Sequence, residues 1–421
     1  MCRRGLQPWV TRPDGLASAV KMNPLLTQLG GYPLAAFQDL KARMHAEGLP
    51  LHDFSIGDPV EPTPAFIRNA LRDAIPEVSQ YPTAAGSRAL REAIATWVQR
   101  RFGVTVDPDR EVLPTAGSKE AIFHFPLGVV DPHGERRAAI WGSPGYQVYE
   151  RGQLFAGGTS DPVDLQDETR WLLELSDLEV PRLQRASVAW VNYPHNPTGA
   201  AADLAYYQRQ VETARTHGIV LASDECYMDI YPPEASAEAG SEGSPPPPSA
   251  LQAAGDGFAG VVSVFSLSKR SGMTGYRCGA LVGDAELIAA QRTLRPNIGT
   301  ASPEFVQAAA IAAWSDDTHV AERRALFDVK RTLMLSFLKE AGFRVGGSEA
   351  TFYLWVAAPG GDDAAYAEAL LRQRVIVSPG RAFGPAGQGW FRLALVPSVE
   401  GCREAVKIWS QAIADGALPG H

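Results

Sequence analysis

The sequence predicts an α/β fold, with a large domain built on a mainly parallel sheet and a smaller α+β domain after it. Between about residues 110 and 282, short apolar runs rich in β-branched residues alternate with helical stretches. These runs are apolar on both faces, as expected for parallel strands that helices cover on both sides. A chain of 421 residues is also too long for a single hydrophobic core, so two domains are expected.

The elements are expected in the following order. Residues 1–21 show no period of 2 or 3.6 and predict a disordered N-terminal extension, with Met22 as an alternative start. Residues 56–295 form the large domain, whose strands lie in EVLPTAG, RAAIWGSPG, ASVAWVNYP, GIVLASDECY, GVVSVFSLSK and CGALVGD. Residues 234–250 (EASAEAGSEGSPPPPSA) have little to bury and predict a mobile surface loop.

The small domain is expected to comprise residues 22–55 and 296–421. After about residue 296 the pattern changes to long amphipathic helices, in PEFVQAAAIAAW and HVAERRALFDVKRTLMLSFLKEAG. The short strands ATFYLWVA, VIVSPG and FRLALV follow.

Composition narrows the possible partners. The net charge of −8 leaves no basic surplus to displace counterions from phosphates, which argues against a nucleic-acid partner. No apolar run approaches the about 20 residues that a membrane span needs, and the N-terminus lacks the apolar stretch of a signal peptide. The scattered cysteines, Cys2, Cys226, Cys278 and Cys402, indicate neither a metal site nor disulfides. We therefore expect a cytoplasmic protein with reduced thiols.

A lysine closes one of the expected strands. In VFSLSKRSGMTGYR, Lys269 follows Ser266 and Ser268, and Arg277 comes eight residues later. A lysine that leaves a buried strand beside hydroxyls and an arginine is well placed to meet a phosphorylated carbonyl compound. Taken alone, however, it could equally be a surface lysine after a strand.

Two further strands end in polar side chains. Asp224 and Tyr227 close GIVLASDECY, and a buried carboxylate needs a cationic partner, such as a protonated pyridine nitrogen. Taken alone, Asp224 could instead cap a helix. Asn196 lies in NYPHNPTG, which in itself is a turn sequence; its functional interpretation is a hydrogen bond to a phenolate oxygen.

Two strand-to-helix turns complete the pattern. In TAGSKEAIF, the amides of Gly117, Ser118 and Lys119 would point from a helix N-terminus, where a phosphate can bind. In SPGYQVYE, Tyr146 could stack on a planar ring, although a lone tyrosine there would usually serve packing.

In this order and spacing, the motifs resemble those of the fold type I pyridoxal-5'-phosphate (PLP) enzymes, specifically the class I/II aminotransferases, over residues 23–415. The resemblance implies that Lys269 carries PLP and exchanges protons, that Asp224 pairs with the ring nitrogen, and that Tyr146 stacks on the ring. It implies that Asn196 and Tyr227 hold the ring oxygen. The implied phosphate ligands are Gly117, Ser118, Lys119, Ser266, Ser268 and Arg277.

The same resemblance implies shared sites and substrate contacts. Tyr81 in QYPTAAGSRALREAIA matches a tyrosine that reaches the phosphate of the neighbouring subunit, which implies a homodimer. Arg392 in WFRLALV matches the arginine that binds the α-carboxylate of the substrate. Gly57, Tyr32 and Asn196 would also contact the substrate, and no metal is implied.

Several segments, including ASDECYMDIY and FSLSKRSGMTGYRCG, resemble the succinyldiaminopimelate aminotransferases of bacterial lysine biosynthesis. The substrates would then be N-succinyl-LL-2,6-diaminopimelate and 2-oxoglutarate, with Arg270 or Arg295 binding the distal carboxylate, unless these arginines are solvated surface charges. An aspartate, alanine or LL-diaminopimelate aminotransferase remains open, as does a PLP-dependent C–S β-lyase. A PLP-binding regulator would need a DNA-binding domain, for which residues 1–21 are too short.

Overall fold

The computed structural model describes residues 23–28, 42–44, 46, 48, 50–233, 245–299 and 301–420. The chain forms two compact units, residues 1–33 and 34–421. In the first unit, α1 (Leu25–Gln28) is a single turn whose first amide donates to Oδ1 of Asn23 at 3.0 Å. The expected extension 1–21, the alternative start Met22 and the candidate Tyr32 lie outside the described residues.

The second unit contains a seven-stranded sheet in the order β2-β8-β7-β6-β5-β3-β4. Only β8 runs against its neighbours, and β7, β6, β5, β3 and β4 are parallel throughout. The strands are β2 (Val112–Thr115), β3 (Ala138–Ser143), β4 (Thr159–Asp164), β5 (Ala186–Val191), β6 (Val220–Asp224), β7 (Val261–Ser266) and β8 (Gly279–Gly283). This mainly parallel sheet confirms the predicted α/β class.

Successive side chains of the central strands enter two different cores, because neighbouring residues of a strand point to opposite faces. Val188 and Trp190 belong to one core together with residues of α5 (Ser118–His124), α6 (Val148–Phe155) and α11 (Ala285–Ile298). Ala189 and Val191 belong to the other, with residues of α4 (Arg88–Phe102), α8 (Leu204–Thr216) and α9 (Ala250–Ala254). Both faces of the sheet are therefore covered, which explains the fully apolar strand sequences.

Helix ends follow local sequence signals. Ser87 accepts a hydrogen bond from Leu90 N at the start of α4, and Gly103 ends the helix in the left-handed conformation, with φ of 71°. Asp203 and Asp284 cap α8 and α11 in the same way through their side-chain oxygens. These caps satisfy amides that have no partner inside the helix.

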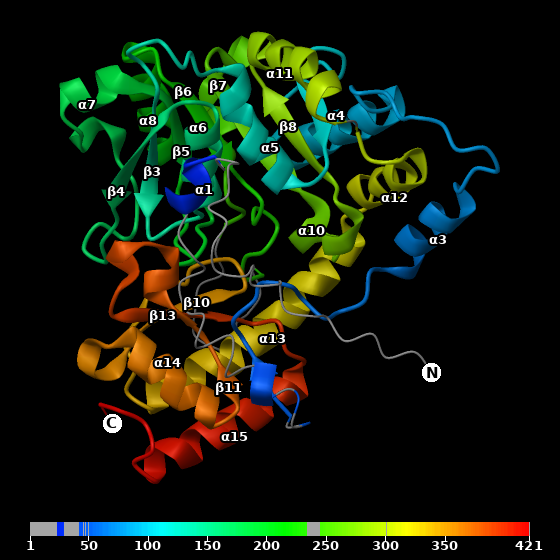
Figure 1. Ribbon diagram of the computed structural model, residues 1–421. Helices are drawn as coiled ribbons and strands as arrows, with labels where there is room; N and C mark the ends of the chain where they lie inside the picture. Colours follow the sequence, from blue (N-terminus) through cyan, green and yellow to red (C-terminus); the bar gives the residue numbers. More distant parts are fainter. Residues whose placement is uncertain are drawn as a thin grey trace, which may run out of the picture. The chain divides into compact units, whose positions relative to one another are not determined.

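A second, antiparallel sheet has the order β12-β13-β10-β9 and lies in the lower half of Figure 1. Its strands are β9 (Val345–Gly346), β10 (Tyr353–Ala357), β12 (Ser378–Pro379) and β13 (Trp390–Ala394), and the helices of this region are α13 (Thr318–Glu340), α14 (Asp363–Arg372) and α15 (Val399–Ala414). A two-residue strand, β1 (His52–Asp53), pairs with β11 (Val375–Ile376). The last large helix before α13, α12 (Glu304–Trp314), packs on α3 (Ala65–Asp73) and α4.

The end of the Pro-rich segment differs from expectation. Residues 234–244 lie outside the described part of the chain, but Pro247, Ser249 and Ala250 are buried. Ser249 forms a capping box with Gln252 at the start of α9. The amide of Ala250 donates to Oε1 of the buried Glu225 at 2.8 Å. The prediction of a mobile surface loop is therefore wrong for the C-terminal end of the segment, which is buried and hydrogen-bonded to the Glu225 carboxylate.

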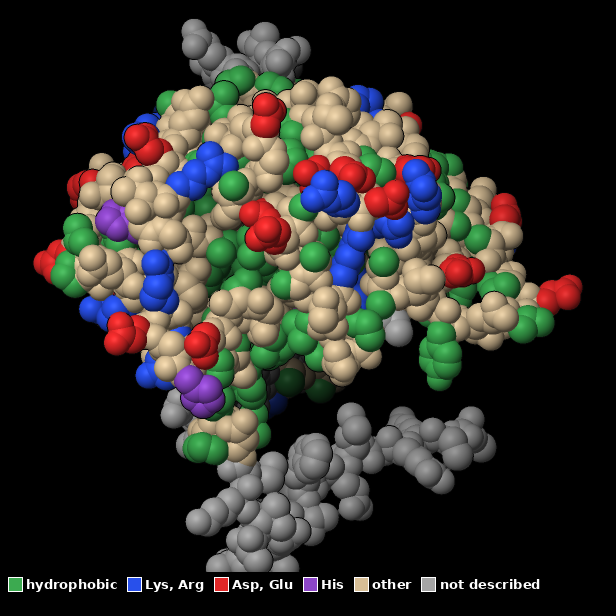
Figure 2. Space-filling view, turned by 90° about the horizontal axis from the view of Figure 1, so that it is seen from above, with side chains coloured by type: hydrophobic (Ala, Val, Ile, Leu, Met, Phe, Trp, Pro, Cys, Tyr) green, Lys and Arg blue, Asp and Glu red, His purple; other side chains and the backbone are tan. Residues whose placement is uncertain are grey.

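The described residues include no helix long and apolar enough to cross a membrane. Among these residues there is also no group of three His, Cys, Asp or Glu side chains that could hold a metal ion. On the face in Figure 2, Lys and Arg side chains alternate with Asp and Glu side chains, without a large area of one sign.

Candidate active site

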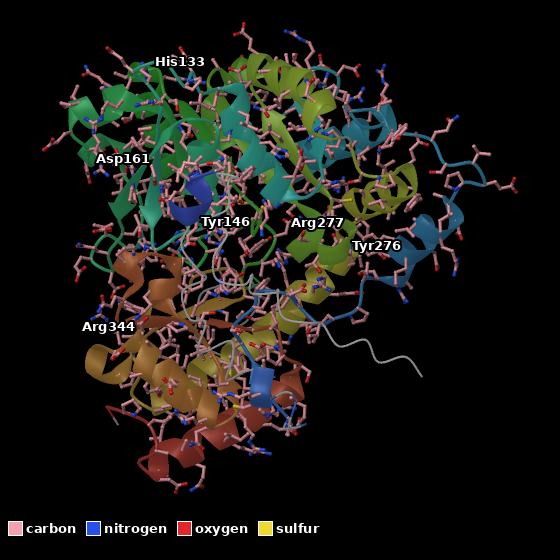
Figure 3. The ribbon with its side chains drawn as sticks, in the orientation of Figure 1. His133, Tyr146, Asp161, Tyr276, Arg277 and Arg344 are labelled. Carbon is pink, nitrogen blue, oxygen red and sulfur yellow. The ribbon has the colours of Figure 1, made fainter. Side chains whose placement is uncertain are left out.

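The candidate residues gather where the parallel strands end. β6 ends at Asp224, β5 leads into the segment that contains Asn196, and β7 leads through Ser266 into the short helix α10 (Leu267–Arg270), which carries Lys269. In parallel sheets, ligands bind at the carboxyl ends of the strands. Tyr146, which follows β3, lies near the centre of Figure 3, and Arg277 lies to its right.

The Lys269 side chain is largely buried. Burial lowers its pKa from 10.5 to about 8, a shift that the Arg392 and Arg277 guanidinium groups support and the Asp58 carboxylate opposes. Its Nζ donates a hydrogen bond to the carbonyl oxygen of Gly57. A neutral amine is a nucleophile and a base, so this environment favours both kinds of chemistry.

The Asp224 carboxylate is 4% exposed. Oδ2 accepts a hydrogen bond from the Tyr149 hydroxyl at 2.7 Å, and Oδ1 accepts one from the Cys226 amide at 3.2 Å. Burial raises the pKa of Asp224, and no Lys, Arg or His among the described residues forms a salt bridge with it. A buried carboxylate without a cation is costly, so this site suits a ligand that brings a positive charge.

Tyr149 is a site residue that the sequence analysis missed. It lies in α6, its ring stacks on Trp190 with centroids 5.0 Å apart, and its hydroxyl orients Asp224. The available signal was its position in SPGYQVYE, in the first turn of the helix that follows Tyr146, against whose ring it packs with centroids 5.7 Å apart.

A cradle for an anion lies between β2 and α5. Gly117 has φ of +79°, and a Cβ at this position would lie only 2.3 Å from Nη2 of Arg277. Only glycine therefore lets this guanidinium lie against the backbone that opens α5. Arg277 is exposed, has φ of 57°, and donates to the Thr274 carbonyl at 2.8 Å.

The other predicted phosphate ligands differ in exposure. Ser118 begins α5 and is half-buried, whereas the Lys119 side chain is exposed. Ser266 and Ser268 are buried, and Oγ of Ser266 accepts from the Ser268 amide at 3.1 Å. The Ser266 hydroxyl therefore keeps its hydrogen available for donation.

Arg392, in β13, is 6% exposed and lies against aromatic rings. Its guanidinium carbon lies 4.2 Å from the ring centroid of Tyr353 and 4.5 Å from that of Phe383. Nη1 donates to Oδ1 of Asn196 at 2.8 Å and Nη2 to the Ser55 carbonyl at 2.8 Å. Nε is buried and has no hydrogen-bond partner among the described residues. A carboxylate is a suitable acceptor for such a donor.

Tyr227 lies close to this arginine. Its hydroxyl is 2.8 Å from that of Tyr353, and burial, followed by the nearby Tyr353, raises its pKa. Asn196 accepts from Arg392 through Oδ1, which leaves its amide Nδ2 to donate. Burial, followed by the Asp224 carboxylate, raises the pKa of Tyr146.

Tyr81 is 94% exposed, and no hydrogen bond or ring contact joins it to another candidate among the described residues. Gly57 lies beside the catalytic candidates, because its carbonyl oxygen accepts a hydrogen bond from Lys269. The structure thus brings together every described candidate except Tyr81 and the exposed side chain of Lys119.

The two arginines expected to bind a distal carboxylate do not have free guanidinium groups, so this expectation is wrong. Arg270 is 3% exposed and forms salt bridges with Asp229 at 2.7 Å and Asp317 at 2.5 Å. Arg295 is 4% exposed and pairs with Glu120 at 3.1 Å. The alternative of solvated surface charges is wrong as well. Both are buried cations, each held by acidic side chains and by backbone carbonyls.

PLP fits the described residues. The buried Asp224 suits a protonated ring nitrogen, and the Gly117–Arg277 cradle suits a phosphate. Lys269, with its lowered pKa, suits bonding to an aldehyde. The spare Nε donor of Arg392 suits the carboxylate of an amino acid.

Known proteins resemble this chain in sequence and in architecture. An LL-diaminopimelate aminotransferase from Aquifex aeolicus (strain VF5) is 35% identical over 387 residues, 91% of this chain and 96% of the relative. An aminotransferase structure from Neisseria meningitidis superposes with a TM-score of 0.83 at 35% identity, covering 93% of this chain and 100% of that one. A probable N-succinyldiaminopimelate aminotransferase from Thermus thermophilus has a TM-score of 0.81 at 29% identity, covering 90% and 99%.

The fold and the site define an α/β transferase that binds PLP. Residues 50–408 match the family model described as aminotransferase class I and II. The chain belongs to this family, and its cofactor is pyridoxal 5'-phosphate. It acts on small amino and keto acids.

Proposed function

We propose that this aminotransferase moves an amino group from LL-2,6-diaminopimelate to a keto acid such as 2-oxoglutarate. The observation that carries the amino-transfer chemistry is the buried Asp224 carboxylate, which has hydrogen-bond donors but no salt-bridge partner in the described chain. The substrate is inferred from the relatives that match over nearly their whole length and are named LL-diaminopimelate aminotransferases.

We propose the following roles in holding the cofactor. Asp224 keeps the ring nitrogen protonated, and Tyr149 fixes the direction of its carboxylate. Asn196 and Tyr227 bind the ring oxygen, and Tyr146 lies against the ring. The phosphate is held by Gly117, Ser118, Lys119, Ser266, Ser268 and Arg277, with Lys119 contributing its backbone amide because its side chain is exposed.

When bound, PLP supplies an electron sink for the charge that develops at the substrate's α-carbon. Lys269 moves the proton at that carbon, and its pKa of about 8 lets it both accept and return a proton near neutral pH. Arg392 binds the substrate's α-carboxylate, and the Tyr353 and Phe383 rings limit its movement. Gly57 lies beside this carboxylate, and Tyr32 remains a proposed substrate contact outside the described residues.

The Thermus structure keeps N-succinyl-LL-2,6-diaminopimelate as a second candidate substrate. The physical argument for it is weaker than the sequence indicated, because neither Arg270 nor Arg295 is available for the succinyl carboxylate.

A panel of amino donors tests the substrate. The purified enzyme is mixed with LL-diaminopimelate, its N-succinyl derivative, glutamate, aspartate or alanine, and the loss of the cofactor's absorbance band is followed. We expect the largest kcat/KM for LL-diaminopimelate, and a larger value for the succinyl compound would reverse the assignment. Release of pyruvate and thiol from cystathionine would indicate a β-lyase instead.

We also propose that the active enzyme is a homodimer in which Tyr81 reaches the phosphate of the other subunit. Tyr81 is 94% exposed, and the neighbouring Ile75 and Val78 are 58% and 73% exposed, an arrangement that a second copy could cover. Mixing Tyr81→Ala with Lys269→Ala subunits should restore part of the activity, because one site of the mixed dimer would be intact. If subunits exchange and no activity returns, Tyr81 does not act across the interface.

A further inference from the structure

Tyr353 touches both halves of the proposed site, although the sequence analysis assigned it no role. It is the first residue of β10, pairs with Ala394 of β13 and is 2% exposed. Its hydroxyl lies 2.8 Å from the hydroxyl of Tyr227, which is proposed to bind the cofactor's ring oxygen. This is a hydrogen bond between two buried phenols.

The same hydroxyl lies against the backbone that contacts the catalytic lysine. A Cβ on Gly57 would lie 2.2 Å from Oη of Tyr353, so only glycine permits this approach. The carbonyl of Gly57 in turn accepts the hydrogen bond from Lys269. The Tyr353 hydroxyl is therefore adjacent to groups on the cofactor side of the site.

The Tyr353 ring lies against Arg392, on the substrate side of the site. The guanidinium carbon of Arg392 lies 4.2 Å from the centroid of this ring, within the range of a cation–π interaction. Because Arg392 is buried, this contact is shielded from water, which strengthens it.

We propose that Tyr353 is a positioning residue with two separable parts, a hydroxyl that orients Tyr227 toward the cofactor and a ring that holds Arg392 toward the substrate carboxylate. The inference rests on the roles proposed above for Tyr227 and Arg392. It differs from simple packing, for which a phenylalanine of nearly the same shape would serve equally well.

The test uses Y353F, which keeps the ring, and Y353L, which removes it. The matched control is Y206F, because Tyr206 is a buried tyrosine whose hydroxyl donates to the Leu173 carbonyl at 2.8 Å in the other core. For the apo form of each protein we would measure the Kd of PLP by fluorescence. For the PLP-loaded form we would measure the pH midpoint of the cofactor's absorbance and inhibition by the unreactive dicarboxylate succinate.

We expect Y353F to raise the Kd of PLP about 3- to 10-fold, as the loss of one buried hydrogen bond does. It should also move the absorbance midpoint to higher pH, because Tyr227 donates more strongly to the ring oxygen when its own hydroxyl oxygen accepts a hydrogen bond from Tyr353. Succinate inhibition should stay within about twofold of wild type, since the ring remains under Arg392. Y353L should weaken succinate inhibition about 3- to 30-fold in addition. Y206F should change none of these values.

If Y353F has the wild-type Kd of PLP and the wild-type absorbance midpoint, the role of the hydroxyl is overturned. If succinate inhibits Y353L as strongly as it inhibits wild type, the role of the ring is overturned. If Y353L does not fold, Y353M takes its place. Failure of the proposed function is distinguishable, because succinate would then also fail to inhibit wild type and Y206F.

Discussion

Lys269 should capture PLP at much lower pH than an ordinary lysine does. Burial lowers its pKa from 10.5 to about 8. At pH 7 a group with a pKa of about 8 is neutral in roughly one molecule in ten, against roughly one in three thousand at 10.5. Only the neutral amine attacks an aldehyde, so the reactive fraction is raised about 300-fold.

The assay mixes the apoenzyme with a limiting amount of PLP for a fixed short time between about pH 6.5 and 10. Borohydride then traps the covalent product, which is quantified by mass. Nα-acetyl-lysine reports the titration of PLP itself, so the ratio of the two yields isolates Lys269. This yield should level off above about pH 8, whereas the yield from the free lysine keeps rising. A shared midpoint near that of free lysine would refute the reasoning.

A charge variant sharpens this test. The Asp58 carboxylate opposes the lowering of the Lys269 pKa, so Asp58→Asn should move the midpoint to lower pH. Asp73→Asn, at an exposed carboxylate of α3, is the matched control and should leave it unchanged. A shift to higher pH in Asp58→Asn would contradict the proposed electrostatics.

Three further results are expected. Asp224→Asn should keep the fold but raise the barrier of proton transfer by about 3 to 4 kcal/mol, so near-normal kcat would argue against its role. Burial raises the pKa of Glu225 from 4.5 to about 7; the folded state then binds more protons than the unfolded chain in this window, and its free energy of unfolding should fall by up to about 3 kcal/mol as pH rises through it. Denaturant titrations at several pH values should show that the free energy of unfolding of Glu225→Gln falls less steeply with pH than that of wild type. An equally steep fall would exclude this carboxyl as the source. Arg270→Ala should cost up to about 3 kcal/mol of stability, because Asp229 stays buried and keeps only Arg101 as a cationic partner. The kcat/KM losses for succinylated and free diaminopimelate should be equal, and a selective loss would restore a substrate role for Arg270.

The parallel strands and the positions of Asp224, Asn196 and Lys269 could be predicted because burial on both faces leaves an apolar run that ends abruptly in polar residues. β4 has no such run. Its sequence is TSDPVD, it pairs only with β3, and its residues are partly or fully exposed. An edge strand tolerates proline and carboxylates, so its sequence resembles that of a loop.

Contacts between distant segments could not be predicted. Arginine is usually solvated, and nothing near Arg270 in the sequence shows that Asp229 lies 2.7 Å away in the fold. Tyr353 resembles an ordinary strand residue in the sequence, and its partner Tyr227 is 126 positions earlier. The identities of the proposed catalytic groups follow local motifs, whereas the side chains that orient them come from the tertiary structure.

Borohydride reduction of the PLP-loaded enzyme, followed by peptide mapping, tests the central claim most directly. The cofactor mass should be found on the peptide that contains Lys269, and Lys269→Ala should retain no covalent label. Lys119 serves as the internal control, because its amide lies in the proposed phosphate cradle while its side chain is exposed. A label on Lys119 or any other lysine of the wild-type protein, with Lys269 unmodified, would contradict the account.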